Sequence, residues 1–212
     1  MAAHGIRSVY AEAGQAVATL MDRVDDWSAP ASESWDVAAL CGHLARSARD
    51  VADYTHGPVA EDVPIPSAAA YYCAHMRQRA ADPEAMDAAI TERARGEISS
   101  NPPEKFRAAQ TAALAAVDWA GPGFVIPTRY GPIQLGEYLR TRNLEFVIHG
   151  VDLARAVGDE DWAPPREALA DAISLLGEVA AASGRGVALV MLLTGRDEPE
   201  SSPALPVVCG AD

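Results

Sequence analysis

Residues 136–158 of this 212-residue chain read GEYLRTRNLEFVIHGVDLARAVG. Apolar side chains cover most of the circumference of the helix that this spacing predicts, so little of the helix can face water. These side chains are Leu139, Leu144, Phe146, Val147, Ile148, Val151 and Leu153. The stretch therefore predicts a buried helix around which the rest of the chain packs.

Four ionisable residues interrupt this apolar helix. Arg142, Glu145, His149 and Asp152 follow one another at spacings of three, four and three residues, which places them in one stripe along one face. Burying an unpaired charge costs several kcal/mol or more, so buried charges are normally paired, hydrogen-bonded or bound to a metal. We therefore expect this stripe to have partners elsewhere in the fold.

Two arrangements would compensate the charges of these four residues. Glu145 and His149 stand one helical turn apart, roughly 6 Å between Cβ atoms, so both can reach one divalent cation. Alternatively, Arg142 pairs with Glu145 and His149 with Asp152, in an internal ladder of ion pairs without a metal. The pattern of this helix alone leaves both alternatives open.

A histidine on a second predicted helix can complete a metal site. Asp36 is suited to cap a helix of residues 37–54, with Trp35 before it and Leu40 in the first turn forming a hydrophobic staple. His43 lies in the second turn among apolar neighbours, where a lone histidine is more often a satisfied core residue than a ligand. We assign His75 a surface or packing role. The two remaining histidines, His4 and His56, have no predicted function.

The helical patterns along the chain predict a mainly α fold, a four-helix bundle over residues 1–160. Helices are expected at residues 6–24, 37–54 and 136–158. Shorter helices at 68–81, 83–97 and 102–117 together form an interrupted third bundle element, and residues 119–133 form a long loop. Residues 161–212 are expected to form a short α/β appendage, with a helix at 165–183 and strands at 187–194 and 205–209.

Composition narrows the class of partner. A net charge of −13 disfavours binding to nucleic acid, because it repels a phosphate backbone. No apolar run approaches the roughly 18 to 20 residues that span a bilayer. The three cysteines have no C-x-x-C spacing and fit a reducing compartment. We expect a cytoplasmic protein, a monomer or a homodimer, that acts on a small molecule and contacts neither nucleic acid nor membrane.

Two motifs carry a resemblance to a known family. W-D-V-A-A-L-C-G-H at residues 35–43 and R-x-x-E-x-x-x-H-G-x-D-L-A-x-A-x-G at residues 142–158 resemble the DinB-like superfamily, specifically the mycothiol-dependent maleylpyruvate isomerase family. The resemblance covers most of residues 5–160 and implies a DinB-like four-helix bundle. It also implies a divalent metal, usually zinc, held by His43, Glu145 and His149, with mycothiol as the thiol. L-L-T-G-R at residues 192–196 looks like a strand end of the family's C-terminal domain, which makes Arg196 a candidate substrate-binding residue.

The residue types agree with such a site. Two imidazoles and one carboxylate leave coordination positions open, as in catalytic zinc sites, although the same set also suits iron(II). A thiol at the open position would lose its proton and become a nucleophile. We expect Asp152 to support His149, and Arg142 either to pair with Glu145 or to face an anionic substrate.

The sequence therefore predicts a metal-dependent, thiol-using enzyme that acts on an electrophilic small molecule. Addition of the thiolate to an activated double bond, rotation and loss of the thiol would isomerise an unsaturated acid. If the thiol stays attached, the outcome is S-transfer. Two alternatives remain open, a non-catalytic metal-binding bundle and a metal-assisted hydrolase.

Overall fold

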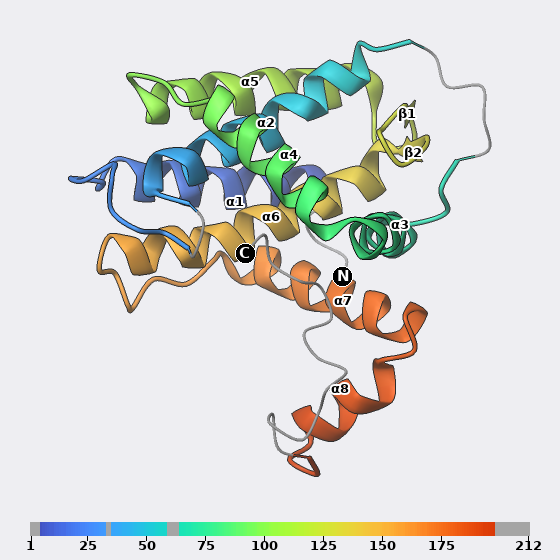
Figure 1. Ribbon diagram of the computed structural model, residues 1–212. Helices are drawn as coiled ribbons and strands as arrows, with labels where there is room; N and C mark the ends of the chain where they lie inside the picture. The colour runs from blue at the N-terminus through green and yellow to red at the C-terminus, as the bar shows by residue number, and fades with distance from the viewer. Residues whose placement is uncertain (1–4, 33–34, 59–63, 198–212) are drawn as a thin grey trace.

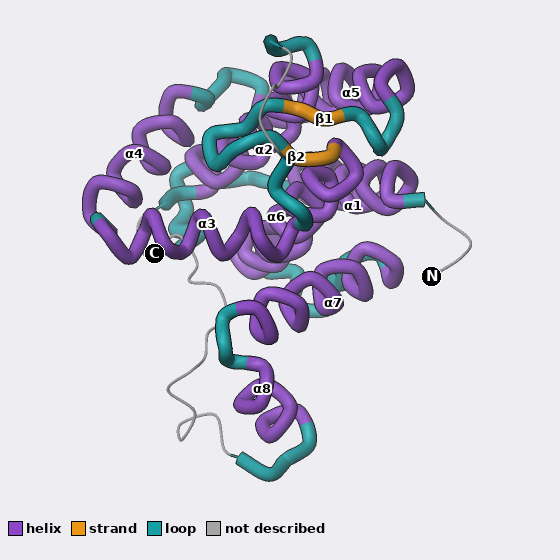
Figure 2. The backbone as a smooth tube through the Cα atoms, turned by 90° about the vertical axis from the view of Figure 1, so that its right-hand side faces the viewer, coloured by secondary structure: helices purple, strands orange, loops and turns teal. Residues whose placement is uncertain are grey.

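The computed structural model describes residues 5–32, 35–58 and 64–197 and is mainly helical (Figure 1). The helices are α1 (Ile6–Met21), α2 (Val37–Thr55), α3 (Ala68–Ala81), α4 (Pro83–Gly96), α5 (Pro102–Ala120), α6 (Leu135–Ala156), α7 (Arg166–Ala182) and α8 (Gly186–Leu193). Two short strands, β1 (Val125–Ile126) and β2 (Ile133–Gln134), pair antiparallel ahead of α6 (Figure 2). The predicted fold class, mainly α, is confirmed.

Helices α1, α2, α5 and α6 form the bundle. Each packs against two others, α2 against α5 and α6, and α1 against α6 and α5, so the four enclose one core. The ring of Phe146 on α6 lies 5.2 Å from that of Tyr10 on α1 and 5.5 Å from that of Phe106 on α5. All three rings are almost fully buried. The helix predicted from residues 136–158 is therefore the buried element around which the bundle packs.

The start of α2 is fixed by its cap. The Asp36 carboxylate accepts a hydrogen bond of 2.8 Å from the backbone N–H of Ala39, as its sequence position predicts. Trp35, the residue before the cap, is buried. Because the cap sets where the first turn begins, it also sets the direction in which His43 leaves the helix in the second turn.

The predicted third bundle element is wrong in one respect. Only α5 belongs to the bundle, whereas α3 and α4 lie outside it (Figures 1 and 2). The physical reason is a short buried surface, since α3 buries only residues of its first turns, Ala68, Ala69, Tyr71 and Tyr72, and α4 buries only Met86 and Ala94. The caps Asp82 and Asn101 begin new helices, each followed by proline, so the three segments have separate axes.

Helix α7 is joined to the bundle by a largely buried polar network. Arg140 on α6 donates to the carboxylates of Asp171 at 3.0 Å and Glu178 at 2.7 Å, both on α7. The side-chain amide of Asn143 donates to Asp171 at 2.9 Å and to the backbone carbonyl of Ala168 at 3.0 Å. These contacts hold α7 along α6, on the side of the bundle that faces away from α5 (Figure 1).

The strand predicted at residues 187–194 is wrong, because this segment forms the helix α8. A short, uniformly apolar run has no periodicity that separates a strand from a helix, so the sequence pattern did not decide between them. Helix α8 projects away from the bundle below α7, with Val187 and Leu193 exposed (Figure 1). The strand predicted at residues 205–209 lies outside the described residues. No helix of the described part of the chain is long and apolar enough to cross a membrane.

We predict that Gly42→Ala destabilises the protein. A Cβ atom at Gly42 in α2 would lie 2.4 Å from the backbone carbonyl oxygen of Ala94 in α4, so the helices would have to separate. Overpacking of this kind costs roughly 1 to 3 kcal/mol, more than the helix gains from alanine. The free energy of unfolding in urea measures the change.

Gly177→Ala is the matched control. Gly177 lies inside α7, and a Cβ atom there would meet nothing within 4 Å. This change should stabilise the protein by about 0.5 to 1 kcal/mol. If both variants changed stability by the same amount and in the same direction, the close approach of α2 and α4 would have no energetic consequence.

Candidate metal centre and adjoining cavity

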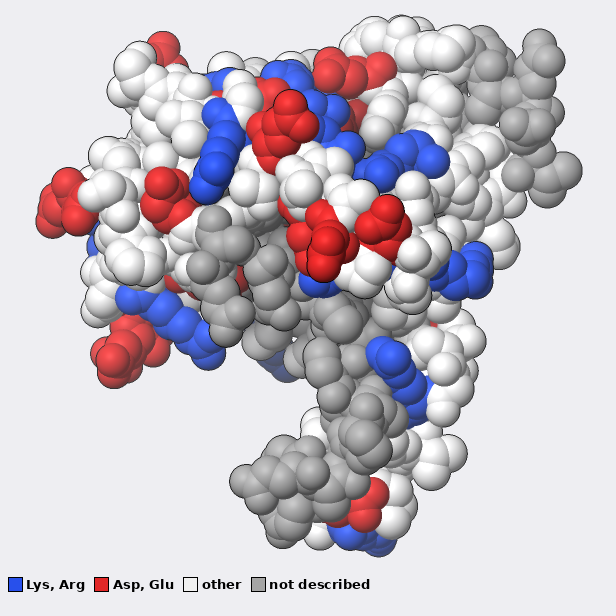
Figure 3. All heavy atoms as spheres, in the orientation of Figure 1, with Lys and Arg blue, Asp and Glu red and all other residues white. Residues whose placement is uncertain are grey.

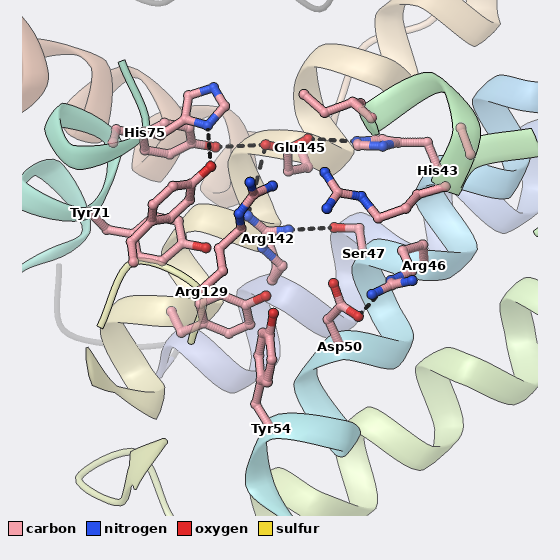
Figure 4. A pocket seen from close by; sticks show the side chains of 16 residues that line it. His43, Arg46, Ser47, Asp50, Tyr54, Tyr71, His75, Arg129, Arg142 and Glu145 are labelled. Atoms are coloured by element: carbon pink, nitrogen blue, oxygen red, sulfur yellow. Dashed lines mark hydrogen bonds and ion pairs between the residues drawn. The ribbon is translucent and has the colours of Figure 1, made fainter. Parts of the chain in front are cut away.

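His43, Glu145 and His149 lie together between α2 and α6. Their ligand atoms are all within 4.8 Å of one another. Nε2 of His43 lies 3.0 Å from Oε2 of Glu145, and Nε2 of His149 lies 3.5 Å from the same oxygen. Figure 4 shows Glu145 and His43 pointing toward each other from opposite helices. The two motifs that lie about 100 residues apart in the sequence thus converge on one carboxylate oxygen.

The donor set and its spacing fit a divalent cation. Ligand atoms about 2.0 to 2.2 Å from zinc lie roughly 3.3 to 3.6 Å apart at tetrahedral angles, close to the separations of the two imidazoles from Glu145. Both histidines direct Nε2 toward the carboxylate. Nδ1 of His149 is hydrogen-bonded to Asp152 at 3.0 Å, which fixes the orientation of its ring. Two imidazoles and one carboxylate leave coordination positions for a further ligand.

The second oxygen of Glu145 is held by residues outside this trio. Oε1 accepts a hydrogen bond of 2.9 Å from the hydroxyl of Tyr72 on α3, and Nη2 of Arg142 lies 3.9 Å away. Burial and the neighbouring charge of Glu145 raise the pKa of Tyr72 well above its ordinary value, so the phenol stays protonated and donates. The glutamate side chain is only 19% exposed, and each of its oxygens has a partner.

The protonation states of the three residues differ. Burial would raise the pKa of Glu145, but hydrogen bonds from His149 and His43 and the charge of Arg142 hold it well below its usual range. Burial lowers the pKa of His43, which is therefore neutral near pH 7. Burial would also lower the pKa of His149, but its hydrogen bonds to Asp152 and Glu145 outweigh burial and raise it to about 9. Without a metal, His149 carries a proton that a cation must displace.

Trp35 covers the two histidines. Its ring centroid lies 4.9 Å from that of His43 and 5.9 Å from that of His149, and the residue is 3% exposed. The indole N–H donates to Thr91 on α4 at 3.1 Å, so the ring is held in place. A hydrophobic ring over the histidines limits the access of water from this side, which strengthens electrostatic interactions at the centre.

A cavity of about 130 Å³ adjoins the candidate centre, and His43 and Glu145 form part of its wall. Arg142 lies beside them, with Nη1 donating to Ser47 at 3.2 Å and its guanidinium 4.8 Å from the centroid of the Tyr138 ring (Figure 4). The other lining residues are Arg46, Asp50, Tyr54, Tyr71, Tyr72, His75, Ile90, Arg93, Ala94, Arg129 and Tyr130. The cavity is therefore polar and aromatic, and it opens beside the carboxylate.

The structure brings five of the six predicted site residues together. His43, Glu145, His149, Arg142 and Asp152 form one connected cluster through the contacts above. Both ion pairs of the metal-free ladder, Arg142 with Glu145 and His149 with Asp152, are present, and His43 joins them from another helix. Arg196, by contrast, is exposed after α8 and does not line the cavity.

Sequence reasoning missed several residues of the site. Tyr72 and Trp35 contact the candidate ligands, and Arg93 and Arg129 line the cavity. Spacing within α6 gave no signal for them, because they come from the segment before α2, from α3 and α4, and from the hairpin. His75, expected to have a surface or packing role, lines the cavity. The remaining histidines are His56, whose Nδ1 lies 2.8 Å from the carbonyl of Ala52, and His4, which lies outside the described residues.

Most of the chain matches a model of a known protein family. A family model described as the mycothiol maleylpyruvate isomerase N-terminal domain matches residues 10–154, more than half of the chain. The matched range contains His43, Glu145 and His149 and ends within α6. No curated protein and no solved structure matches the chain.

We predict that the protein binds about one divalent metal ion per chain through His43, Glu145 and His149. Changing all three to alanine should abolish stoichiometric binding, because each supplies a ligand atom to the same site. Metal content after dialysis, measured by elemental analysis, checks this. His56→Ala, at the end of α2 and away from the cluster, is the matched control and should retain the metal. Stoichiometric metal in the triple variant would rule out this site.

A second prediction concerns Asp152→Asn. Metal affinity should fall roughly 10- to 100-fold, because the carboxylate orients the His149 ring and increases its basicity. The metal affinities of the variant and the parent protein should be compared above pH 9, where the His149 imidazole is neutral without a metal. At lower pH the proton on His149 competes with the metal, so affinity in the parent protein should rise with pH until about 9.

The control for this variant is Asp161→Asn, an exposed carboxylate just after α6. It should bind metal with the affinity of the parent protein. If Asp152→Asn behaved in the same way at pH 9.5, the hydrogen bond between Asp152 and His149 would serve only the local structure.

Proposed function

Because the chain belongs to the family of the mycothiol maleylpyruvate isomerase N-terminal domain, we propose that it is a metal-dependent enzyme that uses mycothiol on an electrophilic small molecule. The observation that carries this proposal is the convergence of two imidazoles and a carboxylate beside a cavity whose wall includes His43 and Glu145. A purely structural ion-pair cluster would not need an adjoining cavity. A structural metal would normally have four protein ligands.

His43, Glu145 and His149 would hold the metal, for which zinc is our first candidate. A divalent cation bound there lowers the pKa of a thiol in its coordination sphere, so that the thiolate is available at neutral pH. Asp152 holds His149 in the orientation that presents Nε2. Tyr72 fixes the other side of the Glu145 carboxylate by donating to Oε1.

The cavity supplies the place for the electrophile. Arg142 is permanently charged, and Ser47 and the Tyr138 ring hold its guanidinium at the cavity wall. It can stabilise negative charge that develops on a substrate carbonyl or carboxylate when a thiolate adds to the conjugated double bond. Rotation about the resulting single bond and loss of the thiolate give the isomer. If the carbanion is protonated instead, the thiol stays attached and the outcome is S-transfer.

We also propose a cellular compartment and a class of partner for the protein. We place the reaction in the cytoplasm, since the free cysteines Cys41 and Cys73 fit a compartment that keeps thiols reduced. The partners would be small molecules only, with the protein a monomer or a homodimer. A substrate role for Arg196 remains a prediction from the resemblance, because this residue lies outside the cavity wall.

We predict that mycothiol binds to the cobalt-substituted protein as a thiolate. Thiolate ligation gives a strong near-ultraviolet charge-transfer band that nitrogen and oxygen ligands do not give. The band should appear on titration with mycothiol, and its apparent affinity should rise with pH until the free thiol ionises. S-methyl mycothiol, which cannot form a thiolate, is the matched ligand control and should give no band.

Two results would replace the proposed function by another. Absence of the band at millimolar mycothiol, together with turnover of an ester or amide without thiol, would favour metal-assisted hydrolysis. Absence of the band and of any turnover would favour a non-catalytic metal-binding bundle. His43→Ala should weaken cobalt binding and lower the band in proportion to the cobalt that is lost, which distinguishes ligation at this site from ligation elsewhere on the protein.

A further inference from the structure

The cavity next to the candidate metal centre gathers positive charge. Four arginines line it against two carboxylates, although the chain as a whole carries a net charge of −13. On the face of the molecule shown in Figure 3, acidic and basic side chains are interspersed over the bundle. The excess of arginine in the cavity is therefore a local feature.

Two of these arginines are compensated. Arg46 donates to Asp50 at 2.8 Å, one turn along α2 (Figure 4). Arg142 lies 3.9 Å from Glu145 and is held by Ser47. Both carboxylates of the cavity wall are thus already engaged by the other two cationic side chains or by the histidines.

Arg93 on α4 is not compensated. It is partly buried, and no carboxylate within the described residues forms an ion pair with it. Burial lowers the pKa of Arg93, and the positive charges of Arg129 and Arg46 lower it further. A guanidinium that is partly desolvated beside two others is costly unless an anion shares the space. The described part of the protein therefore provides no carboxylate counter-ion for Arg93.

Arg129 extends this positive wall to the mouth of the cavity. It lies in the loop between β1 and β2 and is exposed, with its guanidinium 5.0 Å from the centroid of the Tyr130 ring. The Tyr130 hydroxyl is hydrogen-bonded to Nδ1 of His75 at 2.8 Å, which holds the ring in place. Within the described chain, Arg129 also has no carboxylate partner. Its Nη2 donates only a weak hydrogen bond to the sulfur of Met86 at 3.7 Å, so the hairpin presents a second guanidinium without a carboxylate partner toward the same opening.

The position of Arg93 is built into the packing of the helices. Its neighbour Ala94 is buried, and the Ala94 carbonyl lies so close to Gly42 that no side chain fits between α2 and α4. Gly42 directly precedes His43, so one helix crossing places the arginine and the candidate ligand on the same cavity. Such a fixed arrangement differs from a surface arginine that is free to turn toward solvent.

We propose that Arg93 and Arg129 form a carboxylate-binding subsite of this cavity, which selects small organic acids over neutral electrophiles. The cavity volume of about 130 Å³ is close to that of a cavity of ~150 Å³ that holds a benzene-sized molecule, which limits the ligand or its bound part to a few heavy atoms. Guanidinium groups bind carboxylates through paired hydrogen bonds. That the bound acid is a substrate of the enzyme rests on the proposed function. Binding of a carboxylate to the subsite requires neither thiol nor turnover.

Calorimetric titration of the purified protein with succinate tests this proposal. Succinate should bind, and its Kd should rise at least tenfold in Arg93→Gln and further in the variant that also carries Arg129→Gln. Arg95→Gln is the matched control, since Arg95 is exposed two residues along the same helix, and its Kd should stay within twofold of the parent. Arg93→Lys keeps the charge and should lose less affinity than Arg93→Gln. Thermal melting of each variant shows whether it is folded.

Titrations with two further ligands show which chemical group the subsite binds. Dimethyl succinate, which has the same carbon chain without charge, should not bind detectably. Inorganic phosphate that binds more tightly than succinate would assign the subsite to phosphate and overturn the carboxylate proposal. Equal succinate affinity in folded Arg93→Gln and Arg95→Gln would overturn it as well. None of these results depends on the cobalt band, so the subsite and the thiol reaction can fail independently.

Discussion

Placing the Glu145 carboxylate inside a helix bundle is favourable only if both of its oxygens and its charge are compensated. His43 and His149 approach one oxygen, while Tyr72 and Arg142 approach the other. These partners come from α2, α3 and α6, so the carboxylate links three helices. A divalent cation between the oxygen and the two imidazoles would replace the proton on His149 as the compensating charge. The same interaction thus explains why the cluster is stable without a metal and why it suits one.

The surrounding structure serves this cluster. The Asp36 cap sets the direction of His43, Trp35 covers both imidazoles, and the close contact at Gly42 brings α4 to the cavity. Arg140 and its carboxylate partners hold α7 on the other side of α6, where it shields the central helix. The family match ends at residue 154, so the helices beyond α6 lie outside the range that shows the family.

Much of this arrangement could be predicted from the sequence. A buried helix with ionisable residues spaced three and four apart indicated the stripe, and the histidine after the Trp-Asp cap completed the trio once the family resemblance was included. Their role as ligands remains a prediction, whereas their proximity is a property of the structure. Tyr72, Arg93 and Arg129 could not be found in this way, because their distance from Glu145 depends on how separate segments pack. The strand predicted at 187–194 failed because a uniformly apolar run has no diagnostic period.

We propose that Glu145 and the two histidines hold a metal ion that faces the cavity. The decisive measurement is a crystal structure of the metal-loaded protein, with anomalous diffraction measured at the absorption edge of the metal. We expect one anomalous peak between α2 and α6, with Nε2 of His43, Nε2 of His149 and an oxygen of Glu145 each about 2.0 to 2.2 Å away for zinc and one or more remaining positions open toward the cavity. A peak elsewhere on the protein, with the Glu145 carboxylate still hydrogen-bonded directly to both imidazoles, would contradict it.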